Sequence, residues 1–75
     1  MRKFKFNVVV EKDEHGYYAY CPLLDGCQTQ GRTLEEALSN MREAIELYWE
    51  TLSEEERKKI LLKEVKTLDM EVQVA

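Results

Sequence analysis

The residues with the greatest capacity for chemistry are two cysteines and one histidine. Cys21 and Cys27 are five residues apart, and His15 is the only histidine in the chain of 75 residues. A structural zinc site needs four ligands, and a nucleophilic cysteine needs a base within hydrogen-bonding reach. Because Cys21 is expected in a strand and His15 in a turn, nothing forces this pair together. We therefore predict reduced, half-buried thiols, no catalytic residue and no cofactor.

Carboxylates and glycines offer two further kinds of site. Glu11 and Asp25 could gather near strand ends and hold a hard cation, as a residual metal-dependent nuclease would require. Two carboxylates without a third ligand make a weak site, so we predict no bound metal. The glycines, at positions 16, 26 and 31, are dispersed among turns and do not form a loop that could cradle phosphate.

Charge separates the possible binding partners. Tyr17, Tyr18 and Tyr20 could stack bases on a sheet, but few basic residues accompany them. The near candidates are Lys3, Lys5, Lys12 and Arg32. The chain has a formal net charge of -4, whereas binding to nucleic acid favours a basic surface. We expect no direct DNA binding; an acidic surface suits a basic protein partner, although it also aids solubility.

The sequence shows neither a membrane-spanning segment nor an export signal. No stretch approaches the roughly 20 apolar residues that span a bilayer. The basic start, residues 1–5, leads into alternation rather than an apolar run, so it is not a signal peptide. We expect a cytoplasmic protein that forms a single domain over residues 1–75.

The N-terminal half predicts three strands. Residues 3–12 alternate apolar and polar side chains, which is typical of a half-buried strand, and residues 13–16 form a turn. Residues 17–21 form a second strand that ends at Pro22, because proline cannot donate to the ladder. Residues 27–31 form a short third strand, with Cys27 and Thr29 on one face and Gln28 and Gln30 on the other.

The C-terminal half predicts two helices and a closing strand. Thr33 and Glu36 have capping-box spacing before a helix over 34–51, whose apolar stripe excludes Leu47. Ser53 and Glu56 repeat that spacing before a shorter helix over 54–61. Three residues at its end should fold back on the core: Ile60, Leu61 and Leu62. The closing strand is predicted from four alternating apolar residues: Leu68, Met70, Val72 and Val74.

These elements give an α+β fold with two layers, in the order β-β-β-α-(α)-β. One main helix covers one face of a small sheet, so the other face stays open. Open aromatic faces and unpaired strand edges favour binding to another protein or to a second copy. The predicted partner-binding residues lie on that open face: Val9, Tyr18, Tyr20, Gln28 and Gln30. Which of the three neighbouring tyrosines point there depends on the hairpin register.

Residues 11–46 also resemble the signature of the HicB antitoxin family. That family shows a turn with glycine, an aromatic-alanine strand, a proline, a Gly-Cys loop, a strand ending in glycine, and a threonine-capped helix. The matching positions here are Gly16, Tyr17, Tyr18, Ala19, Pro22, Gly26, Cys27, Gly31, Thr33, Glu36, Ala37 and Asn40. The similarity covers residues 4–50 and weakens beyond residue 51.

The resemblance implies a partly degenerate ribonuclease H-like fold and a role as an antitoxin. Its partner would be a small basic toxin of the HicA type, which cuts messenger RNA, and the antitoxin would act by occluding the toxin's active surface. Family members also form dimers or higher oligomers. Longer members carry a C-terminal DNA-binding segment that is not expected here. An orphan scaffold that binds only itself remains the alternative, ahead of the residual nuclease and the RNA-binding module.

Overall fold

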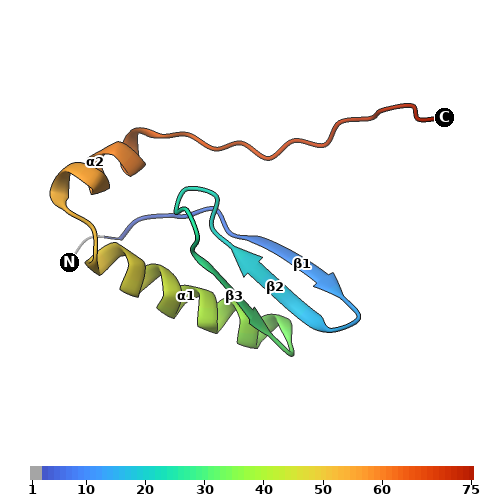
Figure 1. Cartoon of the computed structure of the whole chain (residues 1–75), viewed down its shortest axis with the longest axis horizontal. Coiled ribbons are helices and arrows are strands. Elements are labelled where there is room, and N and C mark those ends of the chain that lie inside the picture. The colour runs from blue at the N-terminus through green and yellow to red at the C-terminus, as the bar shows by residue number, and fades with distance from the viewer. Residues whose placement is uncertain (1–2) are drawn as a thin grey trace.

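The sheet has three antiparallel strands and is followed by two helices. The computed structural model describes residues 3–75, with strands β1 (Val9–Asp13), β2 (Gly16–Tyr20) and β3 (Gln28–Gly31) in the spatial order β1-β2-β3. Helix α1 (Leu34–Glu50) packs along β3 and β2, and α2 (Glu54–Leu62) follows it after a sharp change of direction (Figure 1). The predicted α+β arrangement of a small sheet with one main covering helix is confirmed.

A two-residue turn sets the register of the first hairpin. Asp13 pairs with Gly16, and the Asp13 carboxylate accepts a 2.8 Å hydrogen bond from the His15 backbone N–H. Gly16 has φ +132°, a conformation that L side chains rarely adopt, so the glycine is required at the exit of the turn. This register places Val9 opposite Tyr20 and thereby fixes which tyrosines share a face.

Helix α1 begins at a threonine cap, as predicted, but only half of the predicted capping box forms. The Thr33 hydroxyl accepts a 3.1 Å hydrogen bond from the Glu36 backbone N–H. The Glu36 carboxylate accepts its hydrogen bond from the N–H of Arg32 at 3.1 Å, one residue before the cap. One backbone donor in the first turn of the helix and one just before its cap are thereby satisfied.

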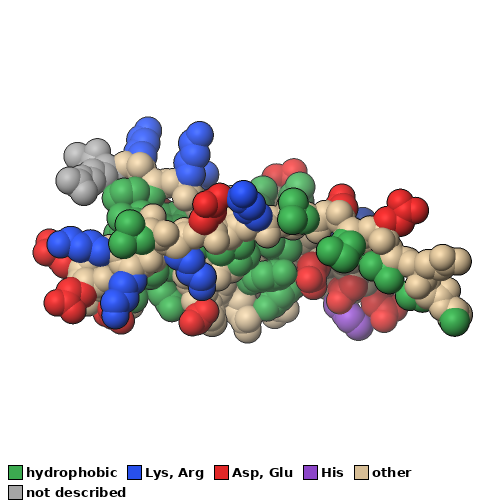
Figure 2. Space-filling view, turned by 90° about the horizontal axis from the view of Figure 1, so that it is seen from above, with side chains coloured by type: hydrophobic (Ala, Val, Ile, Leu, Met, Phe, Trp, Pro, Cys, Tyr) green, Lys and Arg blue, Asp and Glu red, His purple; other side chains and the backbone are tan. Residues whose placement is uncertain are grey.

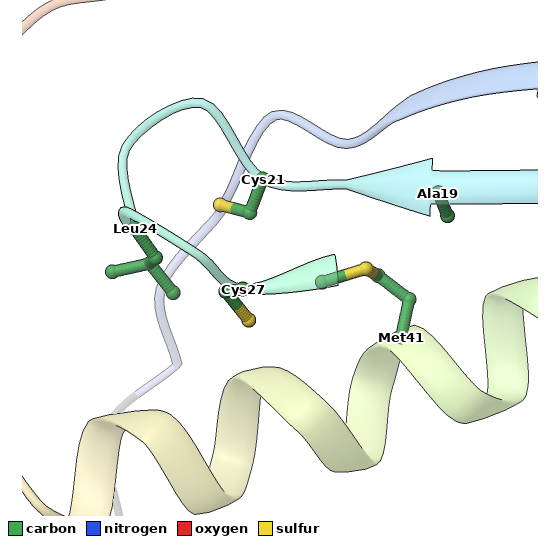
Figure 3. Close-up of a cluster of buried hydrophobic side chains, with 5 residues drawn as sticks. All are labelled: Ala19, Cys21, Leu24, Cys27 and Met41. Atoms are coloured by element: carbon green, nitrogen blue, oxygen red, sulfur yellow. The ribbon is translucent and has the colours of Figure 1, made fainter. Parts of the chain in front are cut away.

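The core lies between the sheet, the loop after β2 and α1. Five buried side chains form it: Ala19, Cys21, Leu24, Cys27 and Met41 (Figure 3). Both cysteines are free thiols, as predicted, but they are buried rather than half-buried, with exposures of 2% and 6%. Three backbone hydrogen bonds within residues 21–27 close the loop and carry Leu24 inward.

Helix α2 is attached at the end of α1. Ser53 and Glu56 form the complete predicted capping box. The Arg57 guanidinium donates to the Trp49 carbonyl oxygen from Nε at 3.1 Å and from Nη2 at 2.8 Å, and it lies over the Trp49 ring. Only Ile60 packs against the core. The prediction that Leu61 and Leu62 also fold back is wrong, because they lie on the outer side with exposures of 48% and 86%.

The predicted closing strand is also wrong. Residues 63–75, which we call the tail, form no helix or strand and project beyond the end of the sheet (Figure 1). The first predicted strand is likewise shorter than residues 3–12, since pairing begins only at Val9. Both segments alternate apolar and polar residues, but neither residues 3–8 nor the tail lie beside a hydrogen-bonding strand. Within residues 3–75, neither helix has the length and apolar composition needed to cross a membrane.

Candidate protein-binding face

The five predicted partner-binding residues lie together on the sheet face opposite α1. Cross-strand pairing sets Val9 beside Tyr20 and Tyr20 beside Gln28, and the next row of the same face sets Tyr18 beside Gln30. Successive side chains of a strand point to opposite faces, and Ala19 between the two tyrosines is fully buried on the helix side. We call this group, together with Glu11 opposite Tyr18, the tyrosine face.

Internal contacts hold the two tyrosines of this face in fixed positions. The Tyr18 hydroxyl donates a 2.6 Å hydrogen bond to the Gln28 side-chain oxygen. The rings of Tyr18 and Tyr20 lie 5.7 Å apart between centroids and are tilted by 37°. Aromatic side chains that are already ordered lose little conformational entropy when a partner covers them.

The third tyrosine of the run points to the other face. Tyr17 pairs with Lys12 and Gly31, and the Lys12 ammonium lies 5.6 Å from the centre of its ring. The sequence pattern alone left this choice open, because it depends on the length of the hairpin turn. The three tyrosines therefore do not form one continuous base-stacking platform.

A shallow hollow of about 300 Å³ at the end of the tyrosine face brings two carboxylates together. Glu11 and Asp25 line it with Tyr18, Tyr20 and Gln28, whereas no lysine or arginine of the described chain lines it. Among residues 3–75, no group of three His, Cys, Asp or Glu side chains is placed to share a metal ion. The two carboxylates that the residual-nuclease hypothesis requires thus line the same hollow, but no third ligand joins them among the described residues.

Several residues of the family signature hold α1 against the sheet on the side opposite the tyrosine face. Gly31 allows α1 to approach β3, since a Cβ there would lie 2.5 Å from the Ala37 backbone nitrogen. Asn40 donates a 3.0 Å hydrogen bond from Nδ2 to the Gln30 carbonyl oxygen and ties the helix to the same strand. Ala37 is fully buried at this contact. These side chains thus serve packing on the helix side of the sheet.

The remaining signature residues shape the loop beside the hollow. Pro22 follows β2 directly, and Gly26 has φ +76° in the turn before Cys27. Burial, with a smaller contribution from the neighbouring Cys21, raises the pKa of the Cys27 thiol. The thiol therefore stays protonated at neutral pH and is a poor nucleophile.

The tail forms an exposed apolar surface where the sequence pattern predicted a closing strand (Figure 2). Its four alternating apolar residues are highly exposed: Leu68 at 80%, Met70 at 83%, Val72 at 65% and Val74 at 83%. The period-two pattern that predicted a closing strand is the signal that could have identified them. An alternating segment without a strand beside it leaves its apolar side uncovered.

Comparison with known proteins identifies a family. The family described as "HicB_like antitoxin of bacterial toxin-antitoxin system" matches residues 6–74. A UPF0150 protein of Helicobacter pylori is 56% identical over 50 residues, which are 67% of this chain and 69% of that protein. A UPF0150 protein of Synechocystis is 52% identical over 50 residues, 65% of this chain and 63% of its own length.

An archaeal protein shows the same likeness. A UPF0150 protein of Thermoplasma acidophilum is 49% identical over 55 residues, which are 72% of this chain and 80% of that protein. No solved structure gives a significant match. The family match extends from the N-terminal segment through the tail, beyond the residue 50 at which the resemblance in the sequence motifs ends.

Proposed function

The chain belongs to the HicB-like antitoxin family of bacterial toxin–antitoxin systems, and we propose that it neutralises a small basic toxin of the HicA type. The tyrosine face covers the toxin surface that cuts messenger RNA. The protein acts by binding, in the cytoplasm, without catalysis of its own and without direct contact to DNA. Residues 1–75 act as a single domain, and its relationship to a partly degenerate ribonuclease H-like fold stays a prediction.

The observation that carries the proposal is the combination of ordered tyrosines and carboxylates on an uncovered sheet face. Tyr18 and Tyr20 supply aromatic area at low entropic cost, and tyrosine is enriched among residues that dominate binding energy. Glu11 and Asp25 give the adjoining hollow a negative charge. A surface that binds RNA is basic, so a negative, aromatic surface is complementary to it.

The same charges disfavour RNA as the ligand of this face. The lysine nearest to the tyrosine run, Lys12, lies over Tyr17 on the other side of the sheet. Bases stacked on Tyr18 and Tyr20 would bring phosphates toward Glu11 and Asp25 without a basic residue at the hollow to compensate. The RNA-binding alternative thus lacks the electrostatic support that such binding requires.

Co-expression tests the proposal. The chain is produced together with any small basic protein that is encoded beside it, and growth and co-purification are measured. We expect the chain to rescue growth and to co-purify with the toxin. Tyr18→Ala should weaken the complex about 30-fold or more, as truncation of a central aromatic residue does. Glu11→Lys should slow association and reduce its salt dependence.

Leu47→Ala is the matched control, because Leu47 is a large exposed side chain, 64% accessible, on α1 and away from the tyrosine face. It should leave rescue and affinity unchanged. Equal losses for Leu47→Ala and Tyr18→Ala would contradict the assignment of the interface. A neighbour that is harmless, or that does not bind, would overturn the toxin-neutralising role.

The exposed apolar tail supports a second candidate, an orphan scaffold that assembles only with itself. Self-association is compatible with both candidates, whereas binding to a toxin occurs only in the first. The co-expression experiment therefore separates them, and a stable homo-oligomer without any toxin partner would favour the scaffold.

A further inference from the structure

The two cysteines of the chain lie opposite each other where the β2–β3 pair ends. The register of these strands sets Tyr20 beside Gln28, so the next pair along the ladder is Cys21 with Cys27. The Cys21 backbone N–H donates a 3.1 Å hydrogen bond to the Cys27 carbonyl oxygen, which continues the pairing by one step. Two cysteines that are separated by five residues in the sequence therefore become neighbours across two chain segments.

Both cysteine side chains belong to the same side of the sheet. Ala19 is fully buried on the helix side, and Cys21 lies two residues further on, so its side chain has the same direction. Cys27 packs in the same buried cluster, and Figure 3 shows the two side chains on the segments that flank the loop. Both thiols are free. The pair is thus buried, reduced and on one face.

The spacing of this pair suits a disulfide bond. Hydrogen-bonded neighbours in an antiparallel pair have Cα atoms about 5.5 Å apart, and disulfides join Cα atoms that are roughly 4.4–6.8 Å apart. Only one of the two possible ladder hydrogen bonds joins Cys21 and Cys27, because the Cys27 N–H and the Cys21 carbonyl oxygen both bond to the backbone of Leu24. The two segments are therefore free to move slightly closer while the side chains rotate toward each other.

We propose that Cys21 and Cys27 are a redox-sensitive pair that forms a reversible disulfide bond across the mouth of the loop 21–27. The oxidant is a small-molecule disulfide of the glutathione disulfide class. In reducing compartments such bonds are transient and serve to sense oxidation, so the reduced pair is the resting state. The proposal rests on the positions of the two cysteines in the fold and does not depend on a toxin.

The oxidation proceeds by two thiol–disulfide exchanges. In the first, one cysteine loses its proton and attacks a sulfur of the oxidant, whose S–S bond breaks; a mixed disulfide forms and one small thiol leaves. In the second, the other cysteine loses its proton, attacks the protein sulfur of the mixed disulfide and displaces the second small thiol. Two electrons and two protons pass from the protein to the oxidant. The reverse exchange with the small thiol restores both cysteines.

The loop decides which cysteine reacts first. Cys21 and Leu24 are buried, whereas Asp25 and Gly26 are exposed and lead directly into Cys27. Opening of this turn uncovers Cys27 before Cys21. In the closed loop, burial raises the pKa of the Cys27 thiol, so the reactive thiolate forms mainly while the loop is open. The pair thus resists a brief exposure to an oxidant and responds to a sustained one.

The bond would fix the loop that lines the hollow beside the tyrosine face. In the reduced chain this loop is closed by three backbone hydrogen bonds, two of which involve Leu24. A covalent link between residues 21 and 27 removes the open states of the loop, so Asp25 stays at the hollow. Oxidation would therefore change the mobility of an acidic contact residue and leave its charge unchanged.

The first experiment measures the disulfide equilibrium of the full-length chain. The protein is equilibrated with glutathione and glutathione disulfide, quenched with acid and alkylated, and its free thiols are counted by mass spectrometry. We expect a single chain that has lost two hydrogen atoms and carries no alkyl group. The equilibrium constant for disulfide formation should be about tenfold or more larger in native buffer than in concentrated urea, because the fold holds the cysteines opposite each other. The reaction should be slower in native buffer, because the loop must open first.

Three results would overturn the proposal. The native chain keeps both thiols free under conditions that oxidise the unfolded chain; oxidation gives only mixed disulfides or disulfides between two chains; or the equilibrium constant is smaller in native buffer than in urea. Cys21→Ala and Cys27→Ala each retain one thiol and are matched controls, which should form no bond within the chain. The comparison between native and unfolded wild-type protein requires no variant, so it holds even if an alanine destabilises the core.

Hydrogen exchange then measures the effect on the loop. The backbone N–H groups of Leu24 and Cys27 donate the hydrogen bonds that close it, and they should exchange about tenfold more slowly after oxidation. The Arg57 N–H donates to the Ser53 carbonyl oxygen in α2 and is the control, which should exchange at the same rate in both states. Equal loop exchange in the two states would contradict the fixing of the loop. Since no toxin is present in these measurements, their failure is distinct from failure of the proposed function.

Discussion

Residues 3–12 and the tail carry the same kind of alternating sequence pattern, yet only the end of the first segment, in strand β1, belongs to a sheet. In β1, Val10 faces the core and pairs with Ala19 on the neighbouring strand. In the tail, Met70 occupies an equivalent alternating position and remains 83% exposed. A two-residue turn places β2 directly beside β1. The tail instead follows α2, and the direction in which α2 ends carries the tail past the sheet. Alternation therefore specifies an extended, two-sided segment, and the connection decides whether a partner strand is within reach.

The largest expected effect on the free energy of unfolding comes from replacing a methionine by alanine in the core, and the same replacement in the tail is the comparison. Met41→Ala removes a side chain that is 1% exposed and should lower the free energy of unfolding by about 2–4 kcal/mol. Met70→Ala should change it by less than about 0.5 kcal/mol in dilute, monomeric protein, as exposed positions do. Urea denaturation followed by circular dichroism measures both values. A comparable loss for Met70→Ala in the monomer would show that the tail packs on its own core.

A smaller effect compares the caps of the two helices, because α1 belongs to the core and α2 lies between core and tail. Thr33→Ala removes the hydroxyl that accepts from the Glu36 N–H and should lower the free energy of unfolding by about 1 kcal/mol. Ser53→Ala removes the equivalent contact in α2, which has no buried residue, so it should fray that helix with little global loss.

The single tryptophan reports the difference between these two variants. Trp49 lies in the last turn of α1 and holds Arg57 of α2 against its ring and its carbonyl oxygen. Ser53→Ala should therefore change Trp49 fluorescence at urea concentrations well below the main transition, while Thr33→Ala should shift the main transition itself. A single shared transition for Ser53→Ala, shifted as far as that of Thr33→Ala, would mean that α2 unfolds with the core.

The sequence predicts the sheet and the helices that enclose the core better than it predicts the tail, for reasons visible in particular residues. Some features depend only on residues close in sequence, so local spacing is enough to predict them. These are the Thr33 cap, the apolar stripe of α1 and the turn that contains glycine. The face of Tyr17 depends on whether the turn has two residues, which spacing alone left open. The Glu36 carboxylate accepts from the backbone N–H of Arg32 and not from that of Thr33. No sequence pattern distinguishes between these two neighbouring donors.

The candidate site shows the same division. Strand alternation places Tyr18, Tyr20 and Val9 on one face as soon as the register is known. The meeting of Glu11 with Asp25 at one hollow depends on the path of the loop 21–27, which is set by the burial of Leu24. Long-range placement of this kind is decided by packing between distant segments, and local propensity does not encode it.

The smallest expected effect tests how far α2 behaves as a separate unit, through the pH dependence of its cap. The Glu56 carboxylate accepts a 2.9 Å hydrogen bond from the Ser53 backbone N–H, and the bonds to Ser53 hold the pKa of Glu56 below its usual value of 4.5. Folding thus favours the charged form, and its contribution to α2 is present above the ordinary pKa and is lost as the pH falls through the lowered one. Circular dichroism and Trp49 fluorescence should show α2 fraying over that acidic range before the core unfolds. Glu56→Gln should remove this component, whereas Glu55→Gln, which lies in the same turn without contacting the cap, should retain it. If the Glu56→Gln protein frayed over the same acidic range as wild type, the cap would not be the cause, and the order of stability from core to α2 to tail would need another explanation.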